Sequence, residues 1–233
     1  MEPVLRTVDL TKNYGAKRAL NPLNMELPAG EIIGLLGPNG SGKTTLIKLI
    51  AGLLTPSTGH VQVCGLPVGP ETKALVSYLP DRVYFSQGKR ISQLLDFFEE
   101  FYKDFDRVRA EEMLTSLEIP MDAKFRTLSK GTKEKIQLAL VMSRRAKLYL
   151  LDEPIAGVDP AAREYILRTV VNNYDRDATV LISTHLIADI EPILDGFVFI
   201  NRGNIVRQGT VDQVRQETGM SLDELFREVF RCF

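Results

Sequence analysis

The sequence predicts an α/β fold built on a mainly parallel sheet, and three observations lead to that fold class. Short apolar runs that end at turn or polar residues predict buried strands at 32–36, 148–152, 179–184 and 196–201. Segments with hydrophobic residues at helical spacing lie between several of these runs, and alternation of strands and helices is typical of a parallel sheet with helices on its faces. A stretch of about sixty residues in the middle of the chain has helical patterns and no convincing strand, so it is expected to be an inserted helical subdomain.

The elements follow in chain order. Residues 4–10 alternate loosely and then break at KNYGAKRAL, which predicts a strand, a turn and a second strand; residues 60–65 and 76–80 are further strand candidates. After the strand at 32–36, apolar residues at i, i+3, i+4 and i+7 predict a helix that the chain has left by Pro56. Three helices are expected in the inserted block, one at 161–174 between two strands, and an amphipathic helix in the tail. The residues that mark these faces are Leu46, Leu49, Ile50 and Leu53; Ile91, Leu94, Leu95, Phe98, Phe101 and Tyr102; Val108, Met113, Leu114 and Leu117; Ile136, Leu138, Ala139, Leu140 and Met142; and Leu222, Leu225, Phe226, Val229 and Phe230.

Composition narrows the class of protein. The chain has 233 residues, of which 44% are hydrophobic and 25% charged, as expected of one ordinary soluble globular domain with room for a subdomain. A formal net charge of -1 argues against a general nucleic-acid binder. The N-terminus lacks the features of a signal peptide, and no apolar run approaches the ~20 residues that span a bilayer. Cys64 and Cys232, the two cysteines, fit a reducing cytoplasm and imply neither a disulfide framework nor a zinc site.

The segment GPNGSGKT, from Gly37 to Thr44, matches the phosphate-loop pattern G-x-x-x-x-G-K-[ST] at every fixed position. Its glycines let successive backbone N–H groups turn toward phosphate oxygens, and the helix that follows adds its positive N-terminal end. The Lys43 ammonium is expected to reach the β- and γ-phosphates, and the Thr44 hydroxyl to ligate Mg²⁺. The sequence therefore predicts a site for a nucleoside triphosphate and Mg²⁺. The predicted contacts are Gly37, Pro38, Asn39, Gly40, Ser41, Gly42, Lys43, Thr44 and Thr45.

A second acidic motif, KLYLLDEP, ends an apolar strand with Asp152 and Glu153. A buried strand delivers its terminal carboxylates to the C-terminal edge of the sheet, beside the phosphate loop. Asp152 is expected to hold Mg²⁺, directly or through water, and Glu153 to orient or polarise the attacking water. The alternative for such a pair alone is two solvated acids at the end of a strand.

Five further segments stand in an order and spacing that resemble those of the nucleotide-binding subunit of ABC transporters, over essentially the whole chain. TLSKGTKEK is similar to the signature motif of that family, AGVD to its D-loop and ISTH to its switch histidine. KNYG places an aromatic residue where the family stacks one on adenine, and YLPD lies at the position of its Q-loop.

The resemblance assigns roles to single residues. Ser129 and the Gly131 amide would contact the γ-phosphate held by a second subunit, so that one chain carries half of each site and dimerisation depends on ATP. His185 would sense the γ-phosphate and position the water, and Tyr14 would stack on adenine. Asp159 would bridge the dimer interface, and from the sequence alone it also suits the N-cap of the helix that follows it.

The resemblance also implies a division of the chain and a function. Residues 1–30 would form an antiparallel β part, 31–84 and 146–209 the nucleotide-binding core, 85–145 the helical subdomain with the signature, and 210–233 a helical tail. The expected protein is an ATPase on the inner face of the cell membrane, a homodimer or heterodimer, that powers a separate permease touched by the helical block. The short chain and its tail resemble small bacterial exporter subunits.

Two residues depart from the pattern of the family, and two alternative functions remain open. Asp81 stands where the Q-loop carries Gln, so that its Mg²⁺ role is in question, and Lys130 stands at the first Gly of the signature, where we expect it to point to water. Non-transport members that act on DNA or ribosomes are disfavoured, because only 86 residues separate Lys43 from Ser129 and no coiled coil or second cassette is present. A module that binds ATP without cleaving it is disfavoured by Glu153 and His185.

Overall fold

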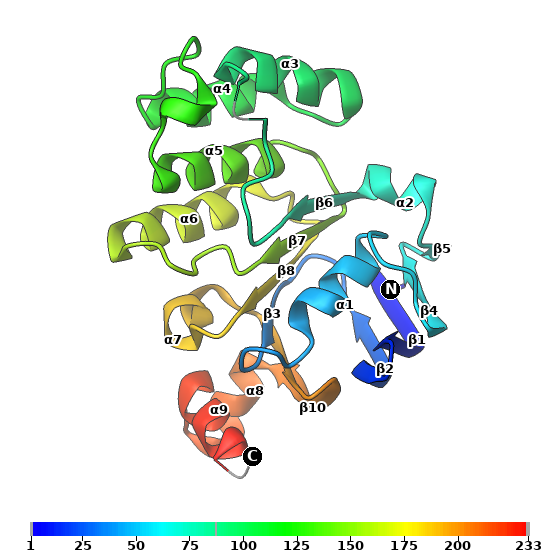
Figure 1. Cartoon of the computed structure of the whole chain (residues 1–233). Helices are drawn as coiled ribbons and strands as arrows, with labels where there is room; N and C mark the ends of the chain where they lie inside the picture. Colours follow the sequence, from blue (N-terminus) through cyan, green and yellow to red (C-terminus); the bar gives the residue numbers. More distant parts are fainter. Residues whose placement is uncertain (1, 87, 232–233) are drawn as a thin grey trace.

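The computed structural model describes residues 2–86 and 88–231, which form two β-sheets and a set of surrounding helices (Figure 1). Cys232 lies outside the described residues. The strands are β1 (Leu5–Tyr14), β2 (Lys17–Leu27), β3 (Ile32–Leu36), β4 (Thr58–Val63), β5 (Leu66–Pro67), β6 (Val76–Leu79), β7 (Leu148–Asp152), β8 (Thr179–Thr184), β9 (Gly196–Asn201) and β10 (Asn204–Thr210). The helices are α1 (Lys43–Ile50), α2 (Pro70–Leu75), α3 (Ile91–Phe101), α4 (Arg107–Ser116), α5 (Lys130–Met142), α6 (Pro160–Asn173), α7 (Ile187–Ile190), α8 (Val211–Thr218) and α9 (Leu222–Phe230), with 3-10 turns η1 (Phe125–Thr127) and η2 (Glu191–Ile193).

The central sheet has six strands in the order β10-β9-β3-β8-β7-β6, parallel except for β10, which pairs antiparallel with β9. Every residue of β3, β7, β8 and β9 is buried, because helices or the second sheet cover both faces. Alternate residues serve two cores: Leu148 and Leu150 face α1, whereas Tyr149 and Leu151 face the helices on the other side. The predicted α/β class with a mainly parallel sheet is confirmed.

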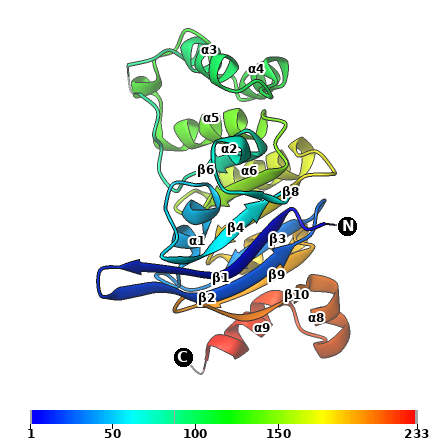
Figure 2. The same ribbon diagram turned by 90° about the vertical axis from the view of Figure 1, so that its right-hand side faces the viewer.

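The second sheet is antiparallel, in the order β2-β1-β4-β5, and packs over α1 to enclose one of the two cores (Figure 2). β1 and β2 form a long hairpin whose tight turn has Gly15 at φ +57°. The β1 ladders shift register beside Asp9, which adopts φ +45°. β4, which follows α1 in sequence, joins this sheet rather than the parallel one, so the antiparallel part draws on residues 5–27 and 58–67.

Helices α3, α4 and α5 make up the inserted block at the top of Figure 1. The aromatic rings inside it pack edge to face: Phe85 lies 5.8 Å from Phe98 and 5.6 Å from Phe125 between ring centroids. Arg144, which follows α5, joins this block to the core. Its side chain is 4% exposed, pairs with Asp104 at 3.0 Å and donates a hydrogen bond to the backbone oxygen of Val76 at 2.6 Å.

The tail helices return to the sheet. α9 places Phe226 edge to face against Phe199 of β9, at 5.3 Å between centroids. Ser221 begins this helix with a capping box, in which its side chain accepts from the Glu224 amide and the Glu224 carboxylate accepts from the Ser221 amide. The amphipathic tail helix predicted from the sequence therefore packs on the core. Within residues 2–86 and 88–231, no helix combines the length and the apolar character that a membrane crossing requires.

Candidate nucleotide site

A cleft of about 900 Å³ opens where the loop between β3 and α1 meets the ends of β6, β7 and β8 and the turn of the β1–β2 hairpin. It collects most of the side chains predicted to touch nucleotide, although they come from segments between Tyr14 and His185 in the sequence. The residues that line it are Tyr14, Lys17, Arg18, Ala19, Asn39, Gly40, Ser41, Gly42, Lys43, Thr44, Thr45, Asp81, Glu153, Ala156, His185 and Arg202.

The phosphate loop has the backbone that its glycines permit. Gly40 and Gly42 adopt φ +79° and +113°, values that residues with a Cβ rarely reach. A Cβ on Gly37 would lie 2.2 Å from the backbone oxygen of Ile200, so only glycine fits there. Lys43 opens α1 and folds back over the loop, where its Nζ donates to the backbone oxygens of Gly37 at 2.8 Å and Pro38 at 3.3 Å.

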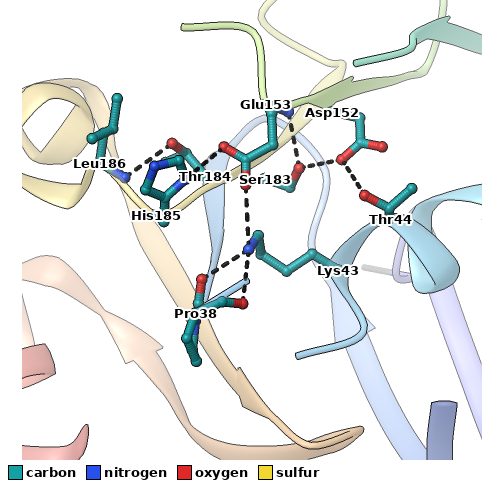
Figure 3. A network of polar contacts seen from close by, with 10 residues as sticks. Pro38, Lys43, Thr44, Asp152, Glu153, Ser183, Thr184, His185 and Leu186 are labelled. Atoms are coloured by element: carbon teal, nitrogen blue, oxygen red, sulfur yellow. Dashed lines mark hydrogen bonds and ion pairs between the residues drawn. The ribbon is translucent and has the colours of Figure 1, made fainter. Parts of the chain in front are cut away.

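Asp152 ends β7 beneath the loop and is completely buried. Its Oδ1 accepts hydrogen bonds from the Ser183 hydroxyl at 2.6 Å and the Thr44 hydroxyl at 3.1 Å, whereas its Oδ2 has no hydrogen-bond partner (Figure 3). Burial raises the pKa of this carboxyl, and the two hydroxyls partly oppose the shift. A buried carboxylate with an unused oxygen fits a cation ligand, because such a group is costly unless it is paired.

Glu153, the next residue, leaves the strand with a left-handed backbone at φ +50°. Its carboxylate lies between two other predicted site residues: Oε1 is 3.3 Å from Lys43 Nζ and Oε2 is 3.1 Å from His185 Nδ1 (Figure 3). Its amide donates to the backbone oxygen and to the hydroxyl of Ser183, at 3.0 and 3.1 Å. The left-handed backbone of Glu153 therefore directs its carboxylate from the edge of the sheet into the cleft, where it can orient a water molecule.

The site also contains a polar atom that fits an anion. The Ser41 hydroxyl, inside the phosphate loop, is buried without a hydrogen-bond partner. The first N–H groups of α1 have no partners within the helix and point toward the cleft end of that helix. Together with the Lys43 ammonium they suit a triphosphate, and Thr44 with Asp152 suits Mg²⁺, since this hard cation prefers oxygen ligands.

Asp81 follows β6 and lines the same cleft, with a side chain that is 41% exposed. Its nearest cation is Arg82, whose Nε lies 3.9 Å away on a side chain 91% exposed, so the pair contributes little. The Gln137 amide of α5 donates to the backbone oxygens of Pro80 and Arg82, both at 3.4 Å, and so holds the chain on either side of Asp81. Asp81 therefore lines the same cleft as Thr44 and Glu153.

Tyr14 ends β1 just before the turn of the hairpin, lines the cleft and is 47% exposed. Lys12 Nζ lies 5.4 Å from the ring centroid. An exposed aromatic ring in the lining of the cleft suits stacking on a base.

Ser129, Gly131 and Asp159, at the starts of α5 and α6, do not line this cleft. Ser129 begins α5, where its hydroxyl accepts from the Thr132 amide at 3.1 Å and bonds the Thr132 hydroxyl at 2.7 Å. Gly131, in the first turn, leaves open space where a Cβ would be. Asp159 caps α6 by accepting from the Ala162 amide at 3.0 Å, which confirms the predicted N-cap. Lys130 points to solvent, with a side chain 77% exposed and 3.7 Å from Glu134.

Sequence reasoning missed several contributors. Ser183 binds both Asp152 and Glu153, and the only signal for it was its place two residues before His185 in ISTH. Gln137 lies among apolar residues of a predicted helix face, and its role depends on the loop that happens to face it. Lys17, Arg18 and Arg202 add positive charge to the lining of the cleft, the first two at the start of β2.

A phosphate loop after a central strand, an acidic pair at the end of a neighbouring strand and a histidine against the second acid define an ATP-binding hydrolase of the phosphate-loop class. The sequence model of the family described as ABC transporter matches residues 20–156. The chain belongs to that family, as an ATP-binding subunit with ATPase activity.

Individual relatives agree with this assignment. The chain is 32% identical over 211 residues to the ABC transporter ATP-binding protein YtrB of Bacillus subtilis (strain 168), covering 89% of this chain and 72% of that protein. It is 30% identical to the linearmycin resistance ATP-binding protein LnrL of the same organism, over 89% of this chain and 69% of the relative. A solved structure of an ATP-binding subunit of an ABC transporter superposes with a TM-score of 0.85 at 30% identity, over 97% of this chain and 99% of that one.

Proposed function

We propose that this ATPase subunit dimerises on ATP and drives export of a substrate through a separate membrane permease. The observation that carries the proposal is the split of the predicted nucleotide contacts over two surfaces. The phosphate loop, Glu153 and His185 share one cleft, whereas Ser129 and Gly131 lie elsewhere, at the open N-terminus of α5. A second subunit is needed to bring such a helix N-terminus to the phosphates.

In this proposal the residues of the cleft have three roles: they bind the phosphates, hold Mg²⁺ and orient the attacking water. The phosphate-loop amides, Thr45 and Lys43 bind the phosphates, and Thr44 and Asp152, with Asp81 nearby, hold Mg²⁺, which would neutralise charge on the phosphate oxygens. Glu153 orients the attacking water and takes its proton, with His185 beside it to sense the γ-phosphate. Lys43 exchanges its bonds to the Gly37 and Pro38 oxygens for phosphate oxygens.

A second depression supports contact with a permease. It has a volume of about 560 Å³ and lies between the core and the inserted block, next to Asp81. Leu53 and Tyr84 line it and are 56% and 52% exposed, a degree of apolar exposure that is common at interaction sites. Since Arg144 joins core and inserted block at its floor, a partner seated here would contact both parts. The resistance function in the name of the linearmycin relative is what favours export over import.

The test takes as candidate permease a multi-span membrane protein encoded beside this chain and co-expresses the two proteins. We expect the two to co-purify from membranes, and the substitution Leu53→Asp to abolish co-purification because it places a charge in the apolar depression. Val171→Asp, a similar change on the outer face of α6 at 41% exposure, is the matched control and should leave co-purification intact. Both variants should retain ATPase activity. Equal loss with both substitutions, or no co-purification of the unchanged chain, would contradict the proposal.

A further inference from the structure

Arg163, near the start of α6, joins two segments that leave the central sheet at the neighbouring strands β7 and β8. Its Nε donates to the backbone oxygen of Val158 at 3.0 Å, and its Nη1 pairs with the Asp189 carboxylate at 2.8 Å. Val158 belongs to the segment that follows β7, whereas Asp189 lies in α7, which follows β8. Because a guanidinium presents its N–H groups in a rigid planar fork, it holds its two partners at a fixed position relative to each other.

The two segments that Arg163 joins carry residues of the candidate nucleotide site. The first runs from Glu153 to Asp159, and the second contains His185, four residues before Asp189. Glu153 Oε2 and His185 Nδ1 are 3.1 Å apart, so the segments also meet inside the cleft (Figure 3). The contacts of Arg163 and the contact between Glu153 and His185 therefore close a ring in which each segment is fixed at two points.

The stability of α6 does not explain why an arginine stands at position 163. Asp159 already caps this helix, because its side chain accepts from the Ala162 amide at 3.0 Å. A cation close to the N-terminal end of a helix opposes the helix dipole. The pair with Asp189 is partly exposed, with side chains 27% and 39% in solvent, and ion pairs of this kind add little stability. The place of Arg163 is explained instead by the two segments that it connects.

We propose that Arg163 is a positioning residue for ATP hydrolysis, which sets the place of His185 against Glu153. The guanidinium fixes both segments away from the cleft, and the His185 ring can then meet the Glu153 carboxylate inside it. A carboxylate oxygen accepts at His185 Nδ1, so this nitrogen carries a proton. Since Val158 precedes Asp159, contact of a second subunit with Asp159 would reach His185 through Arg163; this consequence rests on the shared site of the proposed function.

The first test measures where the proton lies on the His185 ring in the nucleotide-free full chain. The chain has two histidines, so ¹⁵N-labelled histidine gives separate signals for His185 and His60. At alkaline pH, where the ring is neutral, we expect the unchanged chain to hold the proton of His185 on Nδ1. Arg163→Ala should shift the proton toward Nε2, because Glu153 no longer faces the ring. The signals of His60, which lies in β4, are the internal control and should stay unchanged.

The second test measures steady-state ATP hydrolysis. We expect the kcat of Arg163→Ala to fall roughly 10- to 100-fold, the scale of effect of a misplaced group beside the reaction. The KM for ATP should stay nearly unchanged, because neither Arg163 nor Asp189 lines the cleft. Arg163→Lys should lose as much, since an ammonium keeps the charge but not the fork that reaches both partners. Arg168→Ala, an exposed change on the same helix that removes the same charge, should preserve both constants.

A His185 ring that keeps its proton on Nδ1 in Arg163→Ala, or an unchanged kcat in that variant, overturns the inference. If Arg163→Ala also alters the signals of His60, Arg163→Lys and Asp189→Asn break the same pair with smaller changes in volume and give the result. Failure of the proposed function is seen separately. ATP-dependent dimerisation and co-purification with the permease are measured on other samples and do not depend on the position of this proton without nucleotide.

Discussion

Glu153 is the residue on which the polar network of the cleft converges. It contacts Lys43 through one oxygen and His185 through the other, while Ser183 fixes its amide. The Lys43 ammonium bonds a carbonyl group of the phosphate loop and the Glu153 carboxylate. Binding of a triphosphate would draw Lys43 away and leave the carboxylate free to accept from water.

The substitution Glu153→Gln tests this role directly. The amide has the same size and still offers an oxygen to Lys43, but it cannot accept a proton. We expect ATP hydrolysis to fall by roughly 10²- to 10⁴-fold, the usual contribution of a general base, with ATP affinity largely retained. Phosphate release at saturating Mg-ATP and nucleotide titration measure the two quantities. Equal hydrolysis rates for the two proteins would remove the assignment of Glu153.

The charged form of Asp152 is expected to lower the free energy of unfolding, although the proposed function requires that carboxylate. Because its folded pKa lies above the ordinary 3.8, its contribution favours folding at pH below that value and is lost as pH rises through the folded pKa. At neutral pH the charged form is therefore unfavourable in the folded chain. Asp152→Asn keeps an oxygen for Thr44 and Ser183 and should stabilise by roughly 1 kcal/mol, raising Tm by about 2–4 °C. Thermal unfolding at pH 7 without added metal measures this, and an unchanged or lower Tm would contradict it.

At this scale, sequence motifs located the residues that carry charge but not those that hold them in place. Asp152, Glu153 and His185 stand in recognisable segments, because the chemistry requires those residue types there. Ser183 has an ordinary strand sequence around it. Its contacts with Asp152 and Glu153 follow from the pairing of β7 and β8, and a pairing register is a long-range property that a local pattern does not contain.

Among the secondary-structure elements, α9 shows how a tail can belong to the core. Phe226 packs on Phe199 at 5.3 Å and on Phe230 at 4.1 Å between centroids, although its side chain is only half-buried. The helix therefore covers one end of the sheet with an aromatic cluster whose members come from β9 and α9.

Phe226→Ala should consequently destabilise the whole chain. We expect a loss of about 2 kcal/mol, below the ~3–5 kcal/mol of a fully buried Phe because the ring is partly in solvent, and a fall in Tm of roughly 4–8 °C. Phe101→Ala, the same change on α3 at 63% exposure, is the control and should shift Tm little. Similar shifts for both variants would mean that α9 does not stabilise the core.

The limits of a strand could be predicted from the sequence where the strand is an apolar run that is buried on both faces of the sheet. The strands expected at 148–152, 179–184 and 196–201 have those limits in the structure, since a fully apolar run stops where the sheet meets solvent. β1 extends four residues beyond the expected 4–10 because its far half is a solvated hairpin, with polar residues in register with β2. The strand candidate at 60–65 was correct, but local sequence could not tell which sheet it joins.

For the whole molecule, the proposal of a shared site makes a sharp prediction about mass. With Mg-ATP, the Glu153→Gln chain should form a species of twice the 26.1 kDa monomer, measured by light scattering after size exclusion. Adding Ser129→Asp should prevent this, because Asp preserves the helix cap but repels phosphate. Ser129→Asn, an equally good cap without charge, should preserve the dimer. A strictly monomeric Glu153→Gln chain, alone and with its membrane partner, would contradict the shared site.

One hydrogen-bonded link has a mechanical consequence for that assembly. Gln137 grips the carbonyl groups on both sides of Asp81, and it lies on the helix that Ser129 begins. The two positions are eight residues apart, about 12 Å along one rigid rod. A displacement of the first turn of α5, caused by nucleotide bound to the neighbouring subunit, would therefore move the loop that carries Asp81 in this chain's own cleft. Through this one helix, the cleft of each subunit would respond to nucleotide bound in the cleft of the other subunit.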